Sequence, residues 1–470
     1  MHEVAPGDAS PSPVHDGRMH RTRVRWLALS FAGAVACSSG RADTTPRRAS
    51  PGARSDGAPT APWTLSLGPE VNAFVRSAPH GEPFVLGMLG RAGADPSGRV
   101  PIVAAYDVHG GLRWIVEATS QGRAPRPIDA VPLVDGGLAM IGALDPGRTT
   151  IGDRALDAAE GGRFLAVLAS DGSVRFARTI MRSEKGSLST VAALAAAPDG
   201  GWLLGGQLSG AADFGDGIWS SPPEHTEAVL LRYDASGTLT WSHRWRDTGM
   251  QSRADIDGVV IDPLGHVVIT GIASATIDLG AGPVGDPAVE RNAFLAGFRA
   301  DGVLLWSRFF GTPSSTSSLA LTAPVALDDG RIVVGGTFDG GIDWGAGRRE
   351  RGHGALGGFV AAYDIGGHLV AGGETAFVPV SLVDDGGAIS VAGFDPSDGR
   401  TLRAAVAHVT LDGTVLDLLR IGEGSVRSIA PGPGNDVYVC GGFHGVLSIP
   451  GAAELQTTAA QEGFVARMFP

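Results

Sequence analysis

A short motif recurs along this chain and constrains its fold more than any other feature. Each copy has a turn residue, a run of mostly apolar residues, and a closing glycine six positions after the turn residue. Seven copies occur, at residues 81–87, 136–142, 200–206, 265–271, 330–336, 387–393 and 435–441. The closing glycines lie 48 to 65 residues apart. This spacing predicts an array of similar supersecondary units.

The fourth copy shows the unit most clearly. Its sequence predicts strands at 256–261, 266–270, 292–298 and 303–310. Turns at 262–265 and 300–302 separate two pairs of these strands and contain Pro and Gly, which supply the backbone angles of turns. The strands are almost continuous apolar runs, as is typical of sheets covered on both faces. Four short antiparallel strands per unit, repeated radially, predict a β-propeller.

Two further signatures accompany the motif. An aromatic residue stands four positions after the glycine of the third-to-fourth-strand turn, as in Trp114, Trp241 and Trp306. An Asp-x-Gly triplet ends nine positions after the closing glycine in three units. It begins at Asp213, Asp278 and Asp343.

The two ends of the repeat array predict how it closes. The seventh unit stops at residues 463–470, which read as a third strand, so its fourth strand is missing. Residues 63–68 supply a candidate, because Trp63 precedes Gly68 by five positions, as Trp306 precedes Gly311. A strand from the N-terminus would seal an exposed sheet edge. We therefore predict an all-β chain with a single propeller over 62–470. It has seven four-stranded blades and the N-terminal strand completes the last, although six or eight blades also fit the degenerate units.

The unit pattern resembles that of the bacterial seven-bladed β-propeller repeat proteins, which are often secreted and are abundant in myxobacteria. Their unit reads as an apolar strand, Asp-x-x-Gly, an apolar strand ending in Gly, Asp-Phe-Gly, and Tyr-Asp-x-x-Gly-x-x-x-Trp. The third unit carries the last two parts at 213–215 and 233–241. The resemblance covers nearly all of 62–470 and implies the propeller fold and a location outside the cytoplasm. It implies little about function, because these proteins are mostly uncharacterised.

The N-terminus resembles a bacterial lipoprotein signal. Three arginines, Arg21, Arg23 and Arg25, precede an apolar stretch of 11 residues that ends in small residues directly before Cys37. The stretch is too short to span a bilayer comfortably. We predict a signal peptide over 1–36, a translation start at Met19, and lipid attachment at Cys37. Residues 37–61 are poor in large apolar residues and predict a flexible tether. The expected location is the outer membrane of the cell envelope, with the lipid as the sole membrane contact.

Composition narrows the possible partners. The net charge of −12 argues against nucleic acid. The two cysteines, Cys37 and Cys440, provide no disulfide framework, and Cys440 lies in an apolar run that predicts a buried thiol.

The chemistry-bearing residues favour structural roles. The hairpin tryptophans Trp63, Trp114, Trp241 and Trp306 resemble the docking tryptophans of quinoprotein propellers. There the glycine usually follows the aspartate by four positions, whereas Gly237 follows Asp234 by three. We therefore expect docking between blades and no cofactor.

The aspartates Asp213, Asp278 and Asp343 suit a hard cation. One carboxylate per unit lies far from the next, so we expect each to hydrogen-bond within its own loop and bind no metal. No zinc motif, phosphate loop or nucleophile elbow occurs, and no catalytic residue is predicted.

These observations predict a non-enzymatic binding or scaffold module for a protein or polysaccharide at the cell surface. Two alternatives remain open. A propeller enzyme of the glycan hydrolase or lyase type would need paired carboxylates at the channel mouth. A purely structural surface protein would lack a concave pocket of ligand size.

Overall fold

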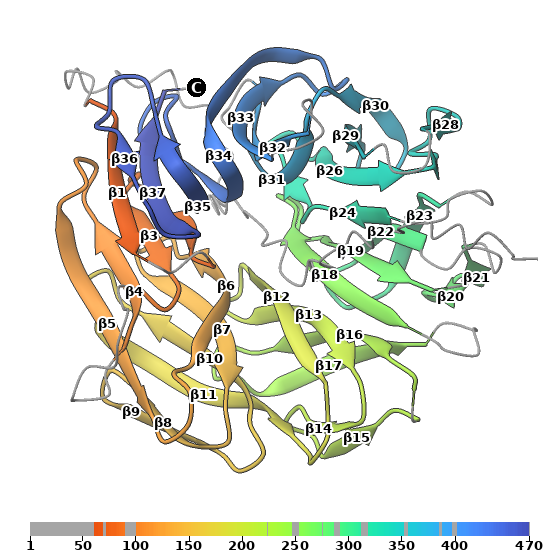
Figure 1. Ribbon diagram of the computed structural model, residues 1–470. Coiled ribbons are helices and arrows are strands. Elements are labelled where there is room, and N and C mark those ends of the chain that lie inside the picture. Colours follow the sequence, from red (N-terminus) through yellow and green to blue (C-terminus); the bar gives the residue numbers. More distant parts are fainter. Residues whose placement is uncertain are drawn as a thin grey trace, which may run out of the picture. The chain divides into compact units, whose positions relative to one another are not determined.

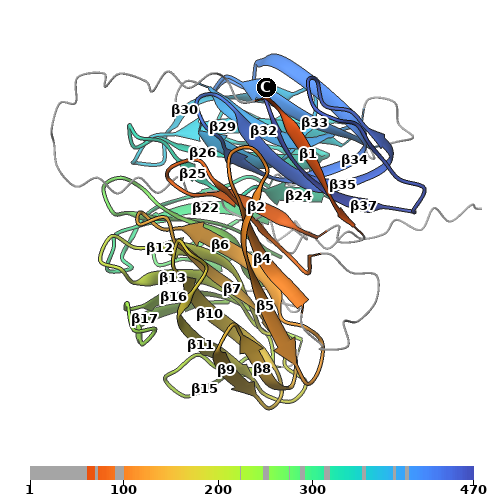
Figure 2. The same ribbon diagram turned by 90° about the vertical axis from the view of Figure 1, so that its left-hand side faces the viewer.

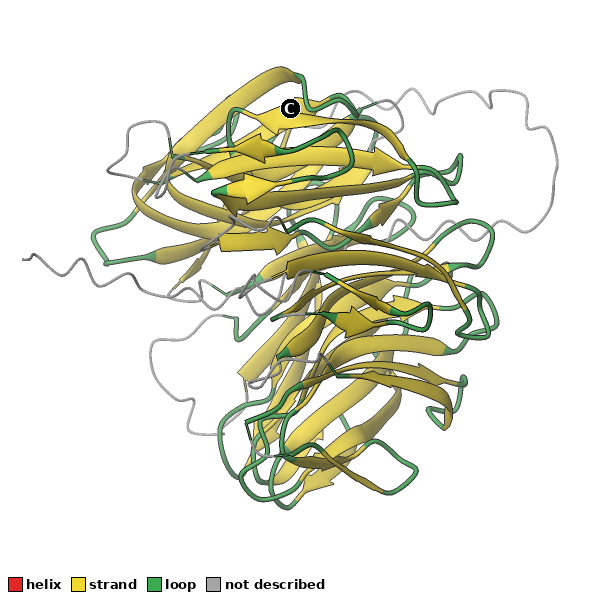
Figure 3. Ribbon diagram, turned by 90° about the vertical axis from the view of Figure 1, so that its right-hand side faces the viewer, coloured by secondary structure: helices red, strands yellow, loops and turns green. Residues whose placement is uncertain are grey.

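A computed structural model of the chain describes residues 61–68, 72–89, 100–222, 224–246, 253–274, 276–285, 292–311, 318–351, 356–384, 388–396 and 402–469. All of them belong to one unit, Ala32–Pro470. They form 37 β-strands and no helix, which confirms the all-β prediction (Figure 3). The predicted signal peptide, Cys37 and all but the last residue of the tether lie outside the described residues. Within the described ranges, no helix is long and apolar enough to cross a membrane.

The strands form successive sheets along the chain (Figure 1). The first sheet has the order β2-β3-β4-β5-β8-β9, with β2 (Phe74–Ser77), β3 (Pro83–Leu86), β4 (Val100–Tyr106), β5 (Leu112–Ser120), β8 (Gly147–Ile151) and β9 (Arg154–Ala158). The second has the order β6-β7-β10-β11-β14-β15, with β6 (Arg126–Pro132), β7 (Leu138–Leu144), β10 (Gly162–Leu168), β11 (Val174–Ser183), β14 (Ala211–Asp213) and β15 (Ile218–Ser220).

The next three sheets each keep a core of four strands. The third contains β12 (Thr190–Ala196), β13 (Trp202–Leu208), β16 (Glu227–Tyr233) and β17 (Leu239–Trp245). The fourth contains β18 (Ala254–Ile261), β19 (Val267–Ala273), β22 (Asn292–Phe298) and β23 (Leu304–Phe309), close to the strands predicted there. The fifth contains β24 (Ser318–Leu321), β26 (Ile332–Asp339), β29 (Gly357–Tyr363) and β30 (Leu369–Thr375), and β25 (Val325–Ala326) also pairs with β26.

The last sheet differs from the prediction of two separate units. Its order is β1-β37-β35-β34-β33-β32-β31, with β1 (Trp63–Gly68), β31 (Val378–Asp384), β32 (Ile389–Asp395), β33 (Arg403–Val409), β34 (Val415–Pro431), β35 (Val437–Leu447) and β37 (Glu462–Met468). Strand β34 is 17 residues long and pairs with β33 through its first part and with β35 through its second. Gly422 and Gly424 adopt positive φ angles of 150° and 141° in the middle of β34. These angles favour glycine and let one strand continue from the sixth unit into the seventh.

The N-terminal strand occupies the predicted edge. Strand β1 pairs antiparallel with β37, and Trp63 lies opposite Arg467 (Figure 2). Strand β2, which follows β1 in the sequence, packs against β34 and β35. The first and last parts of the described chain are therefore in direct contact.

The hydrophobic core is divided among the sheets. The buried apolar residues form seven clusters, and each cluster joins two consecutive sheets or sheet segments. The cluster that includes Val75, Val85, Tyr438, Cys440 and Val465 joins the first sheet to the last. Cys440 is thus the buried small residue that the sequence predicted.

Strand β7 shows why the strands are apolar throughout. Leu138 and Met140 face the cluster shared with the first sheet, whereas Ala139 and Ile141 face the cluster shared with the third. Because successive side chains point to opposite faces, both faces of the strand are buried and every position favours an apolar residue.

The closing glycines of the sequence motif have a steric cause. A Cβ atom at any of six of them would lie closer than 3.0 Å to a backbone carbonyl oxygen of the preceding strand. The pairs are Gly142 with Arg126, Gly206 with Thr190, Gly271 with Asp255, Gly336 with Ala320, Gly393 with Val378, and Gly441 with Ser425. In five of these strands a register shift follows at once, between Pro127/Asp129, Val191/Ala193, Ile256/Gly258, Pro379/Ser381 and Val426/Ser428. Such β-bulges bend the strand locally, and here they accompany the close approach.

Candidate functional site

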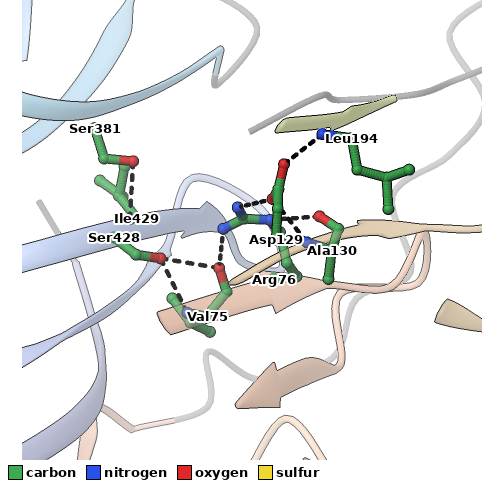
Figure 4. Close-up of polar contacts among 8 residues, drawn as sticks. All are labelled: Val75, Arg76, Asp129, Ala130, Leu194, Ser381, Ser428 and Ile429. Atoms are coloured by element: carbon green, nitrogen blue, oxygen red, sulfur yellow. Dashed lines mark hydrogen bonds and ion pairs between the residues drawn. The ribbon is translucent and has the colours of Figure 1, made fainter. Parts of the chain in front are cut away.

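A buried ion pair connects the first two sheets (Figure 4). Arg76 on β2 and Asp129 on β6 leave only 2% and 0% of their side chains exposed. Asp129 accepts hydrogen bonds from Arg76 Nη2 at 2.9 Å, from the Leu194 amide at 2.8 Å and from its neighbour Ala130 at 2.7 Å. Because Leu194 belongs to β12, one carboxylate connects three sheets.

Two serines make related contacts in the last sheet. Ser428 Oγ accepts from the Val75 amide at 2.9 Å and donates to the Val75 carbonyl at 3.0 Å. Ser381 Oγ accepts from the Ile429 amide at 3.4 Å. Asp129, Ser381 and Ser428 each stand at the position where register resumes after a β-bulge. A polar side chain at this position therefore accepts a hydrogen bond from an amide on a strand of the next unit (Figure 4).

The fourth sheet lacks this contact, because it has neither the polar side chain nor the amide that the side chain would bind. Gly258 stands after the bulge in β18. An added Cβ there would meet Pro324, and proline has no amide proton to donate. The acceptor and the donor are missing together.

Burial raises the pKa of Asp129 to about 7, while Arg76 and the amides of Leu194 and Ala130 act in the opposite direction. The carboxyl group ordinarily titrates near 3.8. Its native pKa therefore lies above its unfolded pKa, and the native state holds the proton more tightly.

This shift predicts a pH dependence of stability. The stability that proton binding at Asp129 adds is fully present below about pH 4 and is lost as the pH rises through about 7. In Asp129→Asn, which cannot titrate, we expect the free energy of unfolding to fall less between pH 4 and pH 8 than in the wild type. Urea unfolding at a series of pH values measures this difference. Parallel curves for the two proteins would refute the expectation.

The predicted tryptophans contact turns of the next sheet. The indole N–H groups of Trp63, Trp114 and Trp306 donate to the carbonyls of Val108, Ser170 and Ile365, at 3.0, 2.9 and 2.7 Å respectively. Trp63 thereby joins β1 to the hairpin between β4 and β5.

Trp241 makes a similar contact through its ring. The ring centroids of Trp241 and His243 are 5.3 Å apart, and His243 stacks on Trp245 with a centroid distance of 5.1 Å. The Trp241 and His243 rings face Gly302 of the next hairpin. Burial lowers the pKa of His243, which favours a neutral imidazole in this aromatic row.

The turn glycines beneath these rings provide a test of docking. Gly367 has φ +74°, and a Cβ there would lie closer than 3.0 Å to the Trp306 ring, whereas Gly330 has φ +87° and open space. Both alanine substitutions incur the cost of a positive φ, about 1 kcal/mol. We expect Gly367→Ala to cost about 1–2 kcal/mol more, because the docked ring must move. Urea unfolding measures both variants, and equal losses would argue against docking.

The predicted aspartates occupy three separate loops. Oδ1 of Asp213 accepts from the amides two and four residues later, at 2.7 and 3.2 Å. Asp278 and Asp343 repeat this arrangement at 2.8 and 3.0 Å and at 2.7 and 3.1 Å. The carboxylates therefore bond to their own loops and do not form a common site.

A cavity of about 370 Å³ lies beside one of these loops. It is lined by Ser307, Arg308, Phe309, Phe310, Gly311, Asp343, Trp344, Gly345 and Tyr363. The Tyr363 hydroxyl donates to the Trp344 carbonyl at 2.7 Å, and the Arg308 Nε donates to the Gly367 carbonyl at 2.6 Å. These polar groups hold neighbouring backbone segments together.

The described residues contain no group of three or more His, Cys, Asp or Glu side chains placed to hold a metal ion. The carboxylate with the largest rise in pKa, that of Asp129, is fully covered and surrounded by donors. A substrate cannot reach it without local opening. Its arrangement suits the joining of strands better than acid–base chemistry.

The sequence analysis missed Arg76, Asp129, Ser381 and Ser428. Each interrupts an apolar run a few residues before a copy of the repeated motif, and this interruption was the available signal. A buried polar group requires a hydrogen-bond partner, but the partner lies on another strand that the local pattern does not identify.

Comparisons with known proteins identify no family for this chain. No family model matches it, and no curated protein matches it. Solved structures that match include a Dyadobacter fermentans protein of unknown function, with 11% identity and a TM-score of 0.38 over 87% of this chain and 97% of that one. A Trypanosoma rangeli sialidase in complex with 2,3-difluorosialic acid has 13% identity and a TM-score of 0.40, over 84% of this chain and 59% of that one. A Bacteroides caccae protein of unknown function has 12% identity and a TM-score of 0.32, over 60% of this chain and 79% of that one. Likenesses at this level assign no function.

Proposed function

We propose that the first five sheets form five blades and that the last sheet forms two, giving a closed seven-bladed β-propeller completed by β1. We further propose that the protein is a non-enzymatic binding scaffold on the cell envelope. The cluster that joins the first sheet to the last supports closure, because it gives the end blades the same contact as the others. The unit pattern supports kinship with the bacterial seven-bladed β-propeller repeat proteins.

The proposed binding role rests on one observation: units that share a four-stranded core carry hairpins of different sequence. Small hairpins stand between the second and third strands of several units. They are β8–β9, β14–β15, β20 (Ile277–Asp278) with β21 (Pro283–Val284), and β27 (Gly341–Ile342) with β28 (Arg349–Glu350). Their exposed residues differ, with Arg154, Ile218 and Glu350 as examples. Variable exposed segments on a rigid frame are the usual place for partner recognition. The net charge of −12 favours a protein or polysaccharide over nucleic acid.

Binding to whole cells tests this role. Labelled protein is added to intact cells that lack the gene, with and without prior protease or periodate treatment. We expect saturable binding that protease removes if the partner is a protein and periodate removes if it is a polysaccharide. Absence of saturable binding would contradict the binding role and leave a purely structural surface protein.

We further propose an outer-membrane anchor at Cys37. Metabolic labelling with a radioactive fatty acid should label the wild type and Cys440→Ser, which keeps Cys37, but not Cys37→Ala. Globomycin should block processing of the labelled forms. A wild-type protein without label would contradict the anchor and leave a secreted or periplasmic protein.

A further inference from the structure

Two arginines flank one small residue in the second sheet. Arg126 on β6 and Arg163 on β10 both lie directly opposite Ala143 on β7. Residues directly opposite each other in an antiparallel sheet point to the same face, with Cβ atoms about 5 Å apart. Both arginine side chains therefore emerge beside the Ala143 methyl group, on the face that Ala139 and Ile141 share with the third sheet.

The two guanidinium groups are close enough to repel each other. Burial and, to a smaller extent, the charge of Arg126 lower the pKa of Arg163 to about 10. No carboxylate opposes these effects. Arg126 is exposed and Arg163 is half-buried.

Neither arginine has a carboxylate partner in the described part of the chain. Arg163 Nη1 donates to the Gly162 carbonyl at 2.9 Å, and its buried Nε has no hydrogen-bond partner. Asp145 follows Ala143 by two residues but forms no ion pair with either arginine. Three buried arginines elsewhere in the described residues are paired with acids: Arg76–Asp129, Arg232–Asp199 and Arg467–Asp436.

The two arginines are specific to the second sheet and are not repeated in the third and fourth sheets. The positions equivalent to Arg126 and Arg163 are Thr190 and Ala228 in the third sheet, which lie opposite Gln207. In the fourth sheet they are Asp255 and Ala293, opposite Ile272. The architecture therefore does not require two cations at this place.

We propose that Arg126 and Arg163 form a binding site for an oxyanion group: a carboxylate, sulfate or phosphate. A guanidinium presents N–H groups in a planar fork that matches two oxygens of such a group. Nε of Arg163 is covered and Nη1 donates to the Gly162 carbonyl, which leaves Nη2 for contact with the anion, and the exposed Arg126 completes the site from the solvent side. The anion would offset the repulsion between the two cations. The group belongs to an acidic polysaccharide or to a small free ion; the choice of polysaccharide rests on the proposed binding function.

Titration calorimetry at constant ionic strength tests the site in the full mature protein. The probes are inorganic phosphate, sulfate, monomeric galacturonate and an oligogalacturonate, with chloride as the reference ion. We expect saturable binding of at least one probe, weakened about tenfold or more in Arg126→Gln and in Arg163→Gln. Arg175→Gln should bind normally, because it has the same charge change at an exposed pair with Asp135 on the same sheet. Tighter binding of the oligomer than of the monomer identifies a polysaccharide source, and equal binding identifies a small free ion.

A second measurement keeps the test independent of folding defects. In chloride alone at low ionic strength, Arg126→Gln should melt at a higher temperature than the wild type, because the repulsion is relieved. Adding the bound probe should raise the melting temperature of the wild type but not that of the variant. Equal responses of the wild type, Arg126→Gln and Arg175→Gln, or no saturable binding of any probe, would overturn the proposal. If the protein binds a probe but does not bind to cells, the anion site is supported and the proposed function is contradicted.

Discussion

Gly393→Ala is expected to reduce the free energy of unfolding by about 3 kcal/mol or more. Gly393 closes the sixth copy of the sequence motif and lies opposite Pro379 in the strand pair β31–β32. A Cβ at this position would lie closer than 3.0 Å to the Val378 carbonyl oxygen. The obstacle is backbone in a paired strand, so it cannot turn aside as a flexible side chain can. The loss is a large part of the 5–15 kcal/mol that typically stabilises a folded domain.

Gly265→Ala is the matched control. Gly265 opens the fourth motif copy with φ +86°, and a Cβ there would have no neighbour within 4 Å. Its substitution should cost about 1 kcal/mol, from the backbone conformation alone. Chemical denaturation of both variants measures the difference. A loss for Gly393→Ala no larger than that for Gly265→Ala would show that the close approach is absent.

Asp129→Ala is expected to cost about 3–5 kcal/mol at pH 7. The substitution removes the acceptor of three donors at once, on Arg76, Leu194 and Ala130. All three donors remain buried, and one of them carries a positive charge. Urea unfolding at fixed pH measures the loss.

Asp135→Ala provides the comparison at the surface. Asp135 pairs with Arg175, and the two side chains are 45% and 44% exposed. Solvent screens such pairs, so its loss should cost about 1 kcal/mol or less. If both alanine variants were equally stable, the contact between the three sheets would not contribute as the geometry indicates.

The predictable features of this chain were local. In the fourth unit, strand 292–298 was predicted at the bounds that β22 has, because turn residues mark both of its flanks. The closing glycines are visible in the sequence as regular markers, although the sequence does not show their steric cause. Their cause is a carbonyl on a neighbouring strand, as for Gly393 and Val378. A spacing pattern can detect such a constraint without identifying the atoms that impose it.

The features that escaped prediction depend on distant parts of the chain. Arg76 and Asp129 are 53 residues apart, and Ser428 and Val75 are 353 apart. No periodicity links such positions. The hairpin that adds β14 to the edge of β11 lies in the third unit but pairs with the second sheet. Strand β34 runs without a break from the sixth unit into the seventh, where the repeat predicted two separate units.

The proposed closure of the propeller through β1 is tested most directly by amide hydrogen exchange of residues 63–68. Strand β1 is held by pairing with β37 and by the Trp63 contact with Val108. We predict that a peptide covering 63–68 exchanges roughly a hundredfold or more slowly than an unfolded peptide, since paired amides exchange only when the strand opens. Exchange at the rate of an unfolded peptide would show that β1 does not complete the last sheet and would contradict the closed propeller.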